Sequence, residues 1–185
     1  MFFCKRVLIA GMTVMMVAGG GAGAQDKSFA PVQAQAEINL SDKNASVKAP
    51  LIVEVKPTAD LLAAFARVGD SKTSIQLSVQ ALAPKPDEWT GFQVFLNVPK
   101  SRKSMTAESP HYVGSVAFYG DNEGEAVTFT FDLGQTIEHL KRAKLWQSNK
   151  PLMLTLVGVP GNGPRKRPPT GIVIRQVSVS NGLSG

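Results

Sequence analysis

The chain has 185 residues, with 20 lysines and arginines against 14 aspartates and glutamates, so its net charge at pH 7 is +6. This length supports one domain with an ordinary hydrophobic core. With one cysteine and two histidines, the composition excludes a disulfide framework and any metal centre built from several histidines or cysteines.

The first 24 residues resemble an export signal. Lys5 and Arg6 precede an apolar run over 7–18, and small residues form a cleavage site that ends at Ala24. The apolar run is too short for a membrane-spanning helix. Cleavage would remove the only cysteine and two positive charges, which lowers the net charge from +6 to +4. We expect a periplasmic or secreted protein with no membrane anchor after cleavage, for which nucleic acid is a poor partner.

Residues 25–36 are polar and alanine-rich without a period, which predicts a flexible leader before a single domain over 37–185. Alternating apolar residues predict strands over 37–40 and 46–56. The polar segment at 41–44 predicts a turn between these strands.

The period changes to that of a helix after Thr58, which is the expected N-cap, and Gly69 follows the last turn. One helical stripe holds the apolar residues Leu61, Leu62, Phe65 and Val68. Regular alternation then predicts an amphipathic strand over 73–81.

The stretch over 92–120 predicts two strands joined by a long basic loop. The second of these strands, 112–119, is apolar on both faces, which predicts a position inside a sandwich rather than at an exposed edge. Alternation over 127–131 predicts a further strand that follows it as a hairpin arm.

Apolar residues recurring at i, i+4 and i+7 from Leu133 predict a second short helix with Asp132 as its N-cap. Strands are predicted over 152–159 and 172–179, and a shift of the apolar phase predicts a bulge near Arg175. About eight short strands with one or two short helices indicate a mainly β fold, an antiparallel β-sandwich or a jelly-roll-like barrel.

Candidate catalytic residues are few. No Gly-x-Ser-x-Gly elbow is present, and the glycines at 158–163 do not lead from a strand into a helix as a phosphate loop does. His111 precedes a strand, where hydrogen bonding to the backbone or packing beside Tyr112 is more typical than metal ligation. His139 lies on a charged helix and is expected to be solvated. We therefore expect no enzymatic activity from this chain alone, and no cofactor or metal of its own.

Several segments resemble the C-terminal domain of tyrosinases and polyphenol oxidases. They are GFQVFLNVP (91–99), PHYVGSVAFYG (110–120), TFTFDLGQTIEHL (128–140), LMLTLVGVPG (152–161) and GIVIRQVSV (171–179). In that family the domain is a β-sandwich that packs over the dicopper catalytic domain and shields its site in a latent precursor. The histidine-bearing catalytic domain is absent from this sequence. The resemblance therefore implies a free-standing counterpart that binds and shields, or assists, a separately encoded dicopper oxidase.

Candidate residues for the interface with such a tyrosinase-like copper enzyme are of two kinds. Aromatic rings could enter a substrate channel and basic residues could steer docking; the candidates are Trp89, His111, Tyr112, Tyr119, Arg165, Lys166 and Arg167. Two alternatives stay open: a periplasmic small-molecule or carbohydrate-binding β-sandwich module, and a copper-delivery chaperone for a tyrosinase.

Overall fold

The computed structural model describes residues 35–46, 48–70, 73–85, 90–99, 105–118, 123–160 and 171–183. The predicted signal and almost all of the predicted leader therefore lie outside the described residues. The elements within the described ranges are β1 (Gln35–Ala45), β2 (Leu51–Val55), α1 (Ala59–Ala66), β3 (Thr73–Leu82), β4 (Thr90–Leu96), β5 (Tyr112–Ala117), β6 (Ala126–Asp132), α2 (Gly134–Arg142), β7 (Leu152–Pro160) and β8 (Ile172–Leu183).

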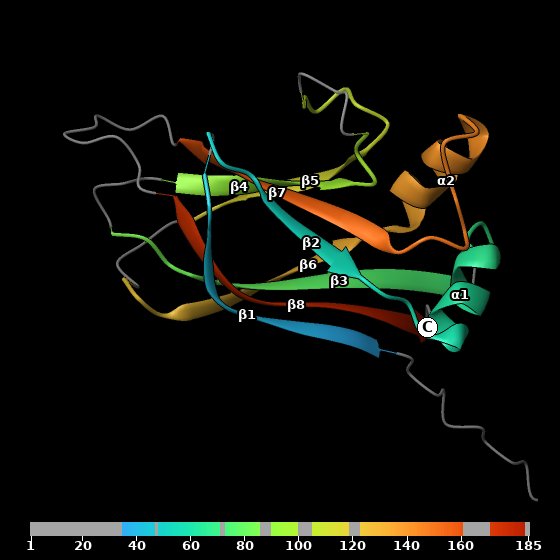
Figure 1. Cartoon of the computed structure of the whole chain (residues 1–185), viewed down its shortest axis with the longest axis horizontal. Helices are drawn as coiled ribbons and strands as arrows, with labels where there is room; N and C mark the ends of the chain where they lie inside the picture. Colours follow the sequence, from blue (N-terminus) through green and yellow to red (C-terminus); the bar gives the residue numbers. More distant parts are fainter. Residues whose placement is uncertain are drawn as a thin grey trace, which may run out of the picture. The chain divides into compact units, whose positions relative to one another are not determined.

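The strands form two antiparallel sheets of four, with the orders β1-β8-β3-β6 and β2-β7-β4-β5. Both helices lie at the same end of the sheets (Figure 1). The prediction of a mainly β, antiparallel sandwich is confirmed. Between the two alternatives, the described strands form two open sheets and not a closed barrel.

The core lies between the inner faces of the two sheets, as strand alternation predicts. Every second side chain of β3, β4 and β7 is buried: Ile75, Leu77, Val79, Ala81, Phe92, Val94, Leu96, Leu152, Leu154 and Leu156. Phe92 of β4 lies in the middle of an aromatic cluster, with ring centroids 5.6 Å from Phe129, 6.2 Å from Phe131 and 6.4 Å from Phe118. Its neighbours Phe129 and Phe131 come from β6, so this cluster ties the two sheets together.

The predicted turn at 41–44 is wrong, because β1 continues through this segment. The register between β1 and β8 shifts here, and Asp42 adopts a left-handed φ of 60°. Residues that favour turns therefore make a bulge inside the strand. The Ser46 N–H donates to the Ala49 carbonyl oxygen before β2, which starts later than predicted, at Leu51.

The predicted bulge at Arg175 of β8 is confirmed. Pairing with β3 passes from Gln80–Gln176 to Ala81–Ile174, so Arg175 has no pairing partner in β3. Its Nε donates a hydrogen bond to the Asp42 carboxylate, 3.1 Å away. The bulges of β1 and β8 are thus joined by an ion pair at the surface.

Two predictions about strand pairing are wrong. β5 lies at the edge of its sheet, and β6 pairs with β3 in the opposite sheet rather than forming a hairpin with β5. The Thr136 hydroxyl of α2 donates to the Tyr112 carbonyl oxygen at 2.9 Å, so α2 is hydrogen-bonded to the first residue of this edge strand.

Both helices begin near their predicted caps. The Thr58 hydroxyl accepts the Leu61 N–H at 3.3 Å, which confirms the N-cap of α1. Asp132 accepts the Gly134 N–H at 2.8 Å from one position before the N-cap residue, Leu133. In the described part of the chain, no helix has the length and apolar character needed to cross a membrane.

Lys141 of α2 holds the end of α1. Its Nζ donates to the carbonyl oxygens of Phe65 at 2.8 Å, Val68 at 3.2 Å and Ala66 at 3.3 Å. Carbonyls in the last turn of a helix lack intrahelical partners, and a cation there also complements the helix dipole. Lys141 therefore fixes the position of α2, and with it the segment that follows.

Replacing Lys141 with methionine keeps the apolar stem and removes these hydrogen bonds. We expect Lys141→Met to lower the free energy of unfolding by about 1–2 kcal/mol, because hydrogen bonds to a charged group are lost. Urea denaturation measures this change. Lys144→Met removes an exposed lysine nearby and should stay within about 0.5 kcal/mol of the parent. Equal losses in the two variants would contradict a capping role for Lys141.

Candidate functional site

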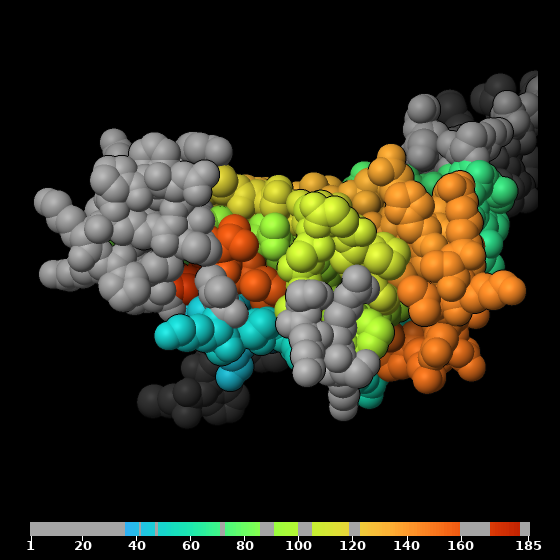
Figure 2. Space-filling view, turned by 90° about the horizontal axis from the view of Figure 1, so that it is seen from above, coloured from blue at the N-terminus to red at the C-terminus, as the bar shows by residue number. Residues whose placement is uncertain are grey.

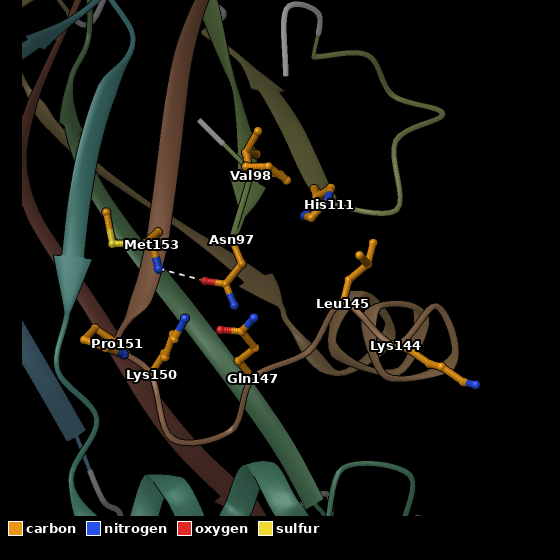
Figure 3. Close-up of a pocket in the computed structure, with 10 residues that line it drawn as sticks. Asn97, Val98, His111, Lys144, Leu145, Gln147, Lys150, Pro151 and Met153 are labelled. Carbon is orange, nitrogen blue, oxygen red and sulfur yellow. Dashed lines mark hydrogen bonds between the residues drawn. The ribbon is translucent and has the colours of Figure 1, made fainter. Parts of the chain in front are cut away.

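A pocket of about 320 Å³ opens where β4 ends, β5 begins and β7 begins (Figure 3). Its walls come from three separate loops and the start of β7: Asn97, Val98, Pro99, His111, Lys144, Leu145, Gln147, Lys150, Pro151 and Met153. The volume lies in the range of small-molecule sites, and the walls are mainly apolar with a few polar groups.

Asn97 fixes the floor of this pocket to β7. Its backbone N–H donates to the Met153 carbonyl oxygen at 2.7 Å, and its side-chain Oδ1 accepts the Met153 N–H at 2.9 Å. Asn97 adopts a left-handed φ of 53°, which asparagine tolerates better than most residues. Since the amide oxygen is used by β7, the amide nitrogen Nδ2 is the group left for a ligand.

His111 is fixed in the same way on the opposite wall. The Leu96 N–H donates to the His111 carbonyl oxygen at 2.8 Å, and the ring Nδ1 lies 2.8 Å from the Leu96 carbonyl oxygen. A carbonyl oxygen only accepts, so Nδ1 carries the hydrogen. The residue is 2% exposed and still lines the pocket. In the neutral ring, Nε2 therefore has a free lone pair and a fixed orientation.

The segment between α2 and β7 supplies the other polar side chains of the pocket. Figure 3 shows Lys150 and Gln147 reaching toward Asn97, whereas the ammonium group of Lys144 points away from it. None of the described lining residues is acidic, so the charge of the pocket is positive. Leu145, an exposed large hydrophobic residue, adds apolar surface at the rim.

A second hollow of about 500 Å³ lies on the other side of the 107–113 segment. It is more polar, and its lining includes Glu108, Tyr112, Asp132 and His139. The Thr106 hydroxyl donates a hydrogen bond to the Glu108 carboxylate and lowers the pKa of this fully exposed group from its usual value.

Across the described ranges, no three histidine, cysteine, aspartate or glutamate side chains come close enough together to hold a metal.

The outer face of the sheet carries a small apolar cluster that the sequence pattern did not separate from the core. Phe95 points away from the sandwich but is fully buried, beneath the ring of Tyr112 at 5.6 Å. Ser109, His111 and Thr155 are also buried. Figure 2 shows the 105–118 segment and α2 side by side on this face. The segment that carries His111 is therefore packed against the outer face of the sheet.

The described residues include two of the seven predicted interface residues. His111 and Tyr112 are neighbours, His111 facing the first pocket and Tyr112 lining the second. The expectation that His111 bonds to the backbone is confirmed. The remaining five lie outside the described residues: Trp89, Tyr119, Arg165, Lys166 and Arg167. The role of all seven at an interface stays a prediction.

Sequence reasoning missed Asn97 and Lys150 as site residues. A signal for Asn97 is its place at the end of a strand, since a polar residue that tolerates positive φ favours such a position. No signal in the sequence places Lys150 beside it.

No protein-family model matches this sequence, and no curated protein matches it either. Several solved structures do. The recombinantly expressed latent aurone synthase, a polyphenol oxidase, matches with a TM-score of 0.51 and 16% identity, covering 77% of this chain and 26% of its own. Latent aurone synthase from its natural source gives a TM-score of 0.47 and 15% identity, covering 80% and 28%. Latent apple tyrosinase gives 0.45 and 13%, covering 77% and 29%.

This chain thus corresponds to about a quarter of the length of the aurone synthase chain. At 16% identity, the match shows a shared fold and nothing of the chemistry.

Proposed function

We propose that this chain is an exported, non-catalytic accessory protein that docks on a separately encoded dicopper oxidase of the tyrosinase type and shields its active site. The observation that carries this proposal is the similarity of its fold to about a quarter of a latent polyphenol oxidase. The quoted sequence segments, which resemble the C-terminal domain of that group of enzymes, support it independently.

Shielding would be steric. An aromatic side chain would occupy the substrate entrance while the sheet surface around it excludes water and phenols. The ring of Tyr112 packs against Phe95, so we assign insertion to Trp89 or Tyr119 and a supporting role to Tyr112. The basic residues over 165–167 would steer the two proteins together.

The decisive experiment uses the mature chain over 25–185 and a purified dicopper oxidase of the tyrosinase type. We expect a stoichiometric complex in size-exclusion chromatography and a fall in diphenol oxidation as the chain is added up to equimolar amounts. If neither complex formation nor altered oxidation is observed, the proposal is wrong.

Charge reversal tests the steering step within this experiment. Replacing Arg165, Lys166 and Arg167 with glutamate should slow association by roughly tenfold at low salt, with a smaller effect at high salt. The matched control reverses three exposed lysines elsewhere, Lys43, Lys48 and Lys56. Equal slowing in both triple variants would show that only net charge matters.

A small-molecule-binding module is the second candidate function, and the pocket between Asn97 and His111 favours it. A carbohydrate-binding form has less support, because Tyr112 and Trp146 pack against Phe95 and Phe65 rather than forming a stacking platform. For the copper-delivery alternative, the described residues hold no group of three or more histidine, cysteine, aspartate or glutamate side chains that could bind the metal.

A further inference from the structure

The pocket at the end of β4 has two fixed polar groups that no described protein atom satisfies. They are His111 Nε2, whose ring is held through Nδ1 by the Leu96 carbonyl, and Asn97 Nδ2, whose amide is held through Oδ1 by Met153. One is an acceptor and the other a donor. Because hydrogen bonds to the backbone fix both side chains, a ligand loses little free energy in ordering them on binding.

The charge of the pocket selects the kind of ligand. Lys150 reaches toward Asn97 in Figure 3, and none of the described lining residues is acidic. An ammonium group beside an amide N–H is suited to a carboxylate, since charge-assisted hydrogen bonds are the stronger ones. The acceptor on His111 is suited to a hydroxyl group. The part of the ligand between its carboxylate and its hydroxyl would lie against apolar walls, which come from Val98, Leu145 and Pro151.

We propose that this pocket binds a small organic carboxylate that has an apolar body and a hydroxyl group. The carboxylate accepts hydrogen bonds from Lys150 Nζ and Asn97 Nδ2, and the hydroxyl donates to His111 Nε2. A volume of about 320 Å³ accommodates a molecule of roughly a dozen non-hydrogen atoms. This inference rests on the second candidate function and not on docking to an oxidase.

The test uses the mature chain and three matched ligands, with binding followed by calorimetry and NMR. The ligands are 4-hydroxyphenylacetate, phenylacetate without the hydroxyl, and the uncharged 4-hydroxyphenylacetamide. We expect the first to bind most tightly, and removal of either the hydroxyl or the charge to weaken binding by roughly tenfold. Sodium sulfate is the control for an adventitious ion. Equal binding of all three ligands, or of sulfate alone, overturns the proposal.

Two lysine variants locate the site. Lys150→Met should weaken binding of 4-hydroxyphenylacetate by roughly tenfold, because it removes the ammonium group that faces Asn97. Lys48→Met removes an equal charge from an exposed lysine that does not line the pocket, and should change affinity by less than about twofold. If the two variants lose affinity equally, a general positive charge explains the binding and the proposed site is wrong.

His111 is tested without substitution, because replacing a buried side chain that bonds to the backbone could unfold the chain. Long-range proton–nitrogen spectra should show hydrogen on Nδ1 and none on Nε2. The Nε2 resonance should move when 4-hydroxyphenylacetate binds and much less when phenylacetate binds. Binding with an unmoved Nε2 resonance overturns the proposal. No oxidase is present in these measurements, so their failure is distinct from a failure of docking.

Discussion

Truncation of Phe92 to alanine is expected to bring this protein close to unfolding. Phe92 is fully buried and its ring contacts Phe118, Phe129 and Phe131, which lie beyond its own strand. Large-to-small changes of this kind cost about 3–5 kcal/mol, from lost burial plus the cavity left behind. Against a total stability of about 5–15 kcal/mol, that is a large fraction. Aromatic edge-to-face contacts between the sheets are lost with the ring.

Urea denaturation, followed by far-UV circular dichroism, measures the effect of Phe92→Ala. The matched control is Ile52→Ala, because Ile52 is also a β-strand residue but is 60% exposed. We expect this control to stay within about 0.5 kcal/mol of the parent. A loss below about 1 kcal/mol for Phe92→Ala would mean that the aromatic cluster does not hold the sheets together.

The same aromatic cluster shows why the sequence predicts strands more accurately than their pairing. Alternation identifies β3 and β4 because one face of each strand is buried, which is a local property. Pairing depends on which residues meet across the core. Phe129 of β6 packs on Phe118, the residue after β5, with ring centroids 5.2 Å apart, although β6 and β5 belong to different sheets. The short segment between β5 and β6 is compatible both with a hairpin and with a crossing from one sheet to the other.

Of the two bulges, the sequence predicts the one in β8 but not the one in β1. At Arg175 the apolar phase of β8 itself changes, so the bulge was predicted correctly. At 41–44 the residues Ser-Asp-Lys-Asn are typical of a turn, and the same preference for positive φ serves a bulge at Asp42. Composition alone does not distinguish these two uses.

The candidate pocket was predictable only in part, because its residues are brought together by contacts between distant segments. The bonding of His111 to the backbone followed from its place before a strand, although the partner, Leu96, did not. Asn97 and Met153 are 56 positions apart and meet only because β4 pairs with β7. Lys150 lies in the segment that joins α2 to β7, so its place in the pocket depends on how these two elements pack.

Addition of one methyl group at Gly91 is expected to be nearly as damaging as the loss of a whole ring at Phe92. A Cβ at Gly91 would overlap the Val116 carbonyl oxygen of β5 and lie 3.1 Å from the Ala117 Cα. These are backbone atoms of the paired strand, so no side chain can rotate away. The glycine is needed for this close approach and not for its φ angle, which is not in the left-handed region.

We expect Gly91→Ala to lower the free energy of unfolding by about 3 kcal/mol, at the upper end of the range for overpacking, because the edge strand must shift. Urea denaturation measures the loss, and amide hydrogen exchange should show that β5 opens more readily than β4. Ser115→Ala is the control, since Ser115 is an exposed residue of the same edge strand and its replacement should change little. A variant as stable as the parent, with unchanged exchange in β5, would show that this edge can move outward at no cost. The tight β4–β5 pairing, which positions the segment carrying His111 and Tyr112, would then need another explanation.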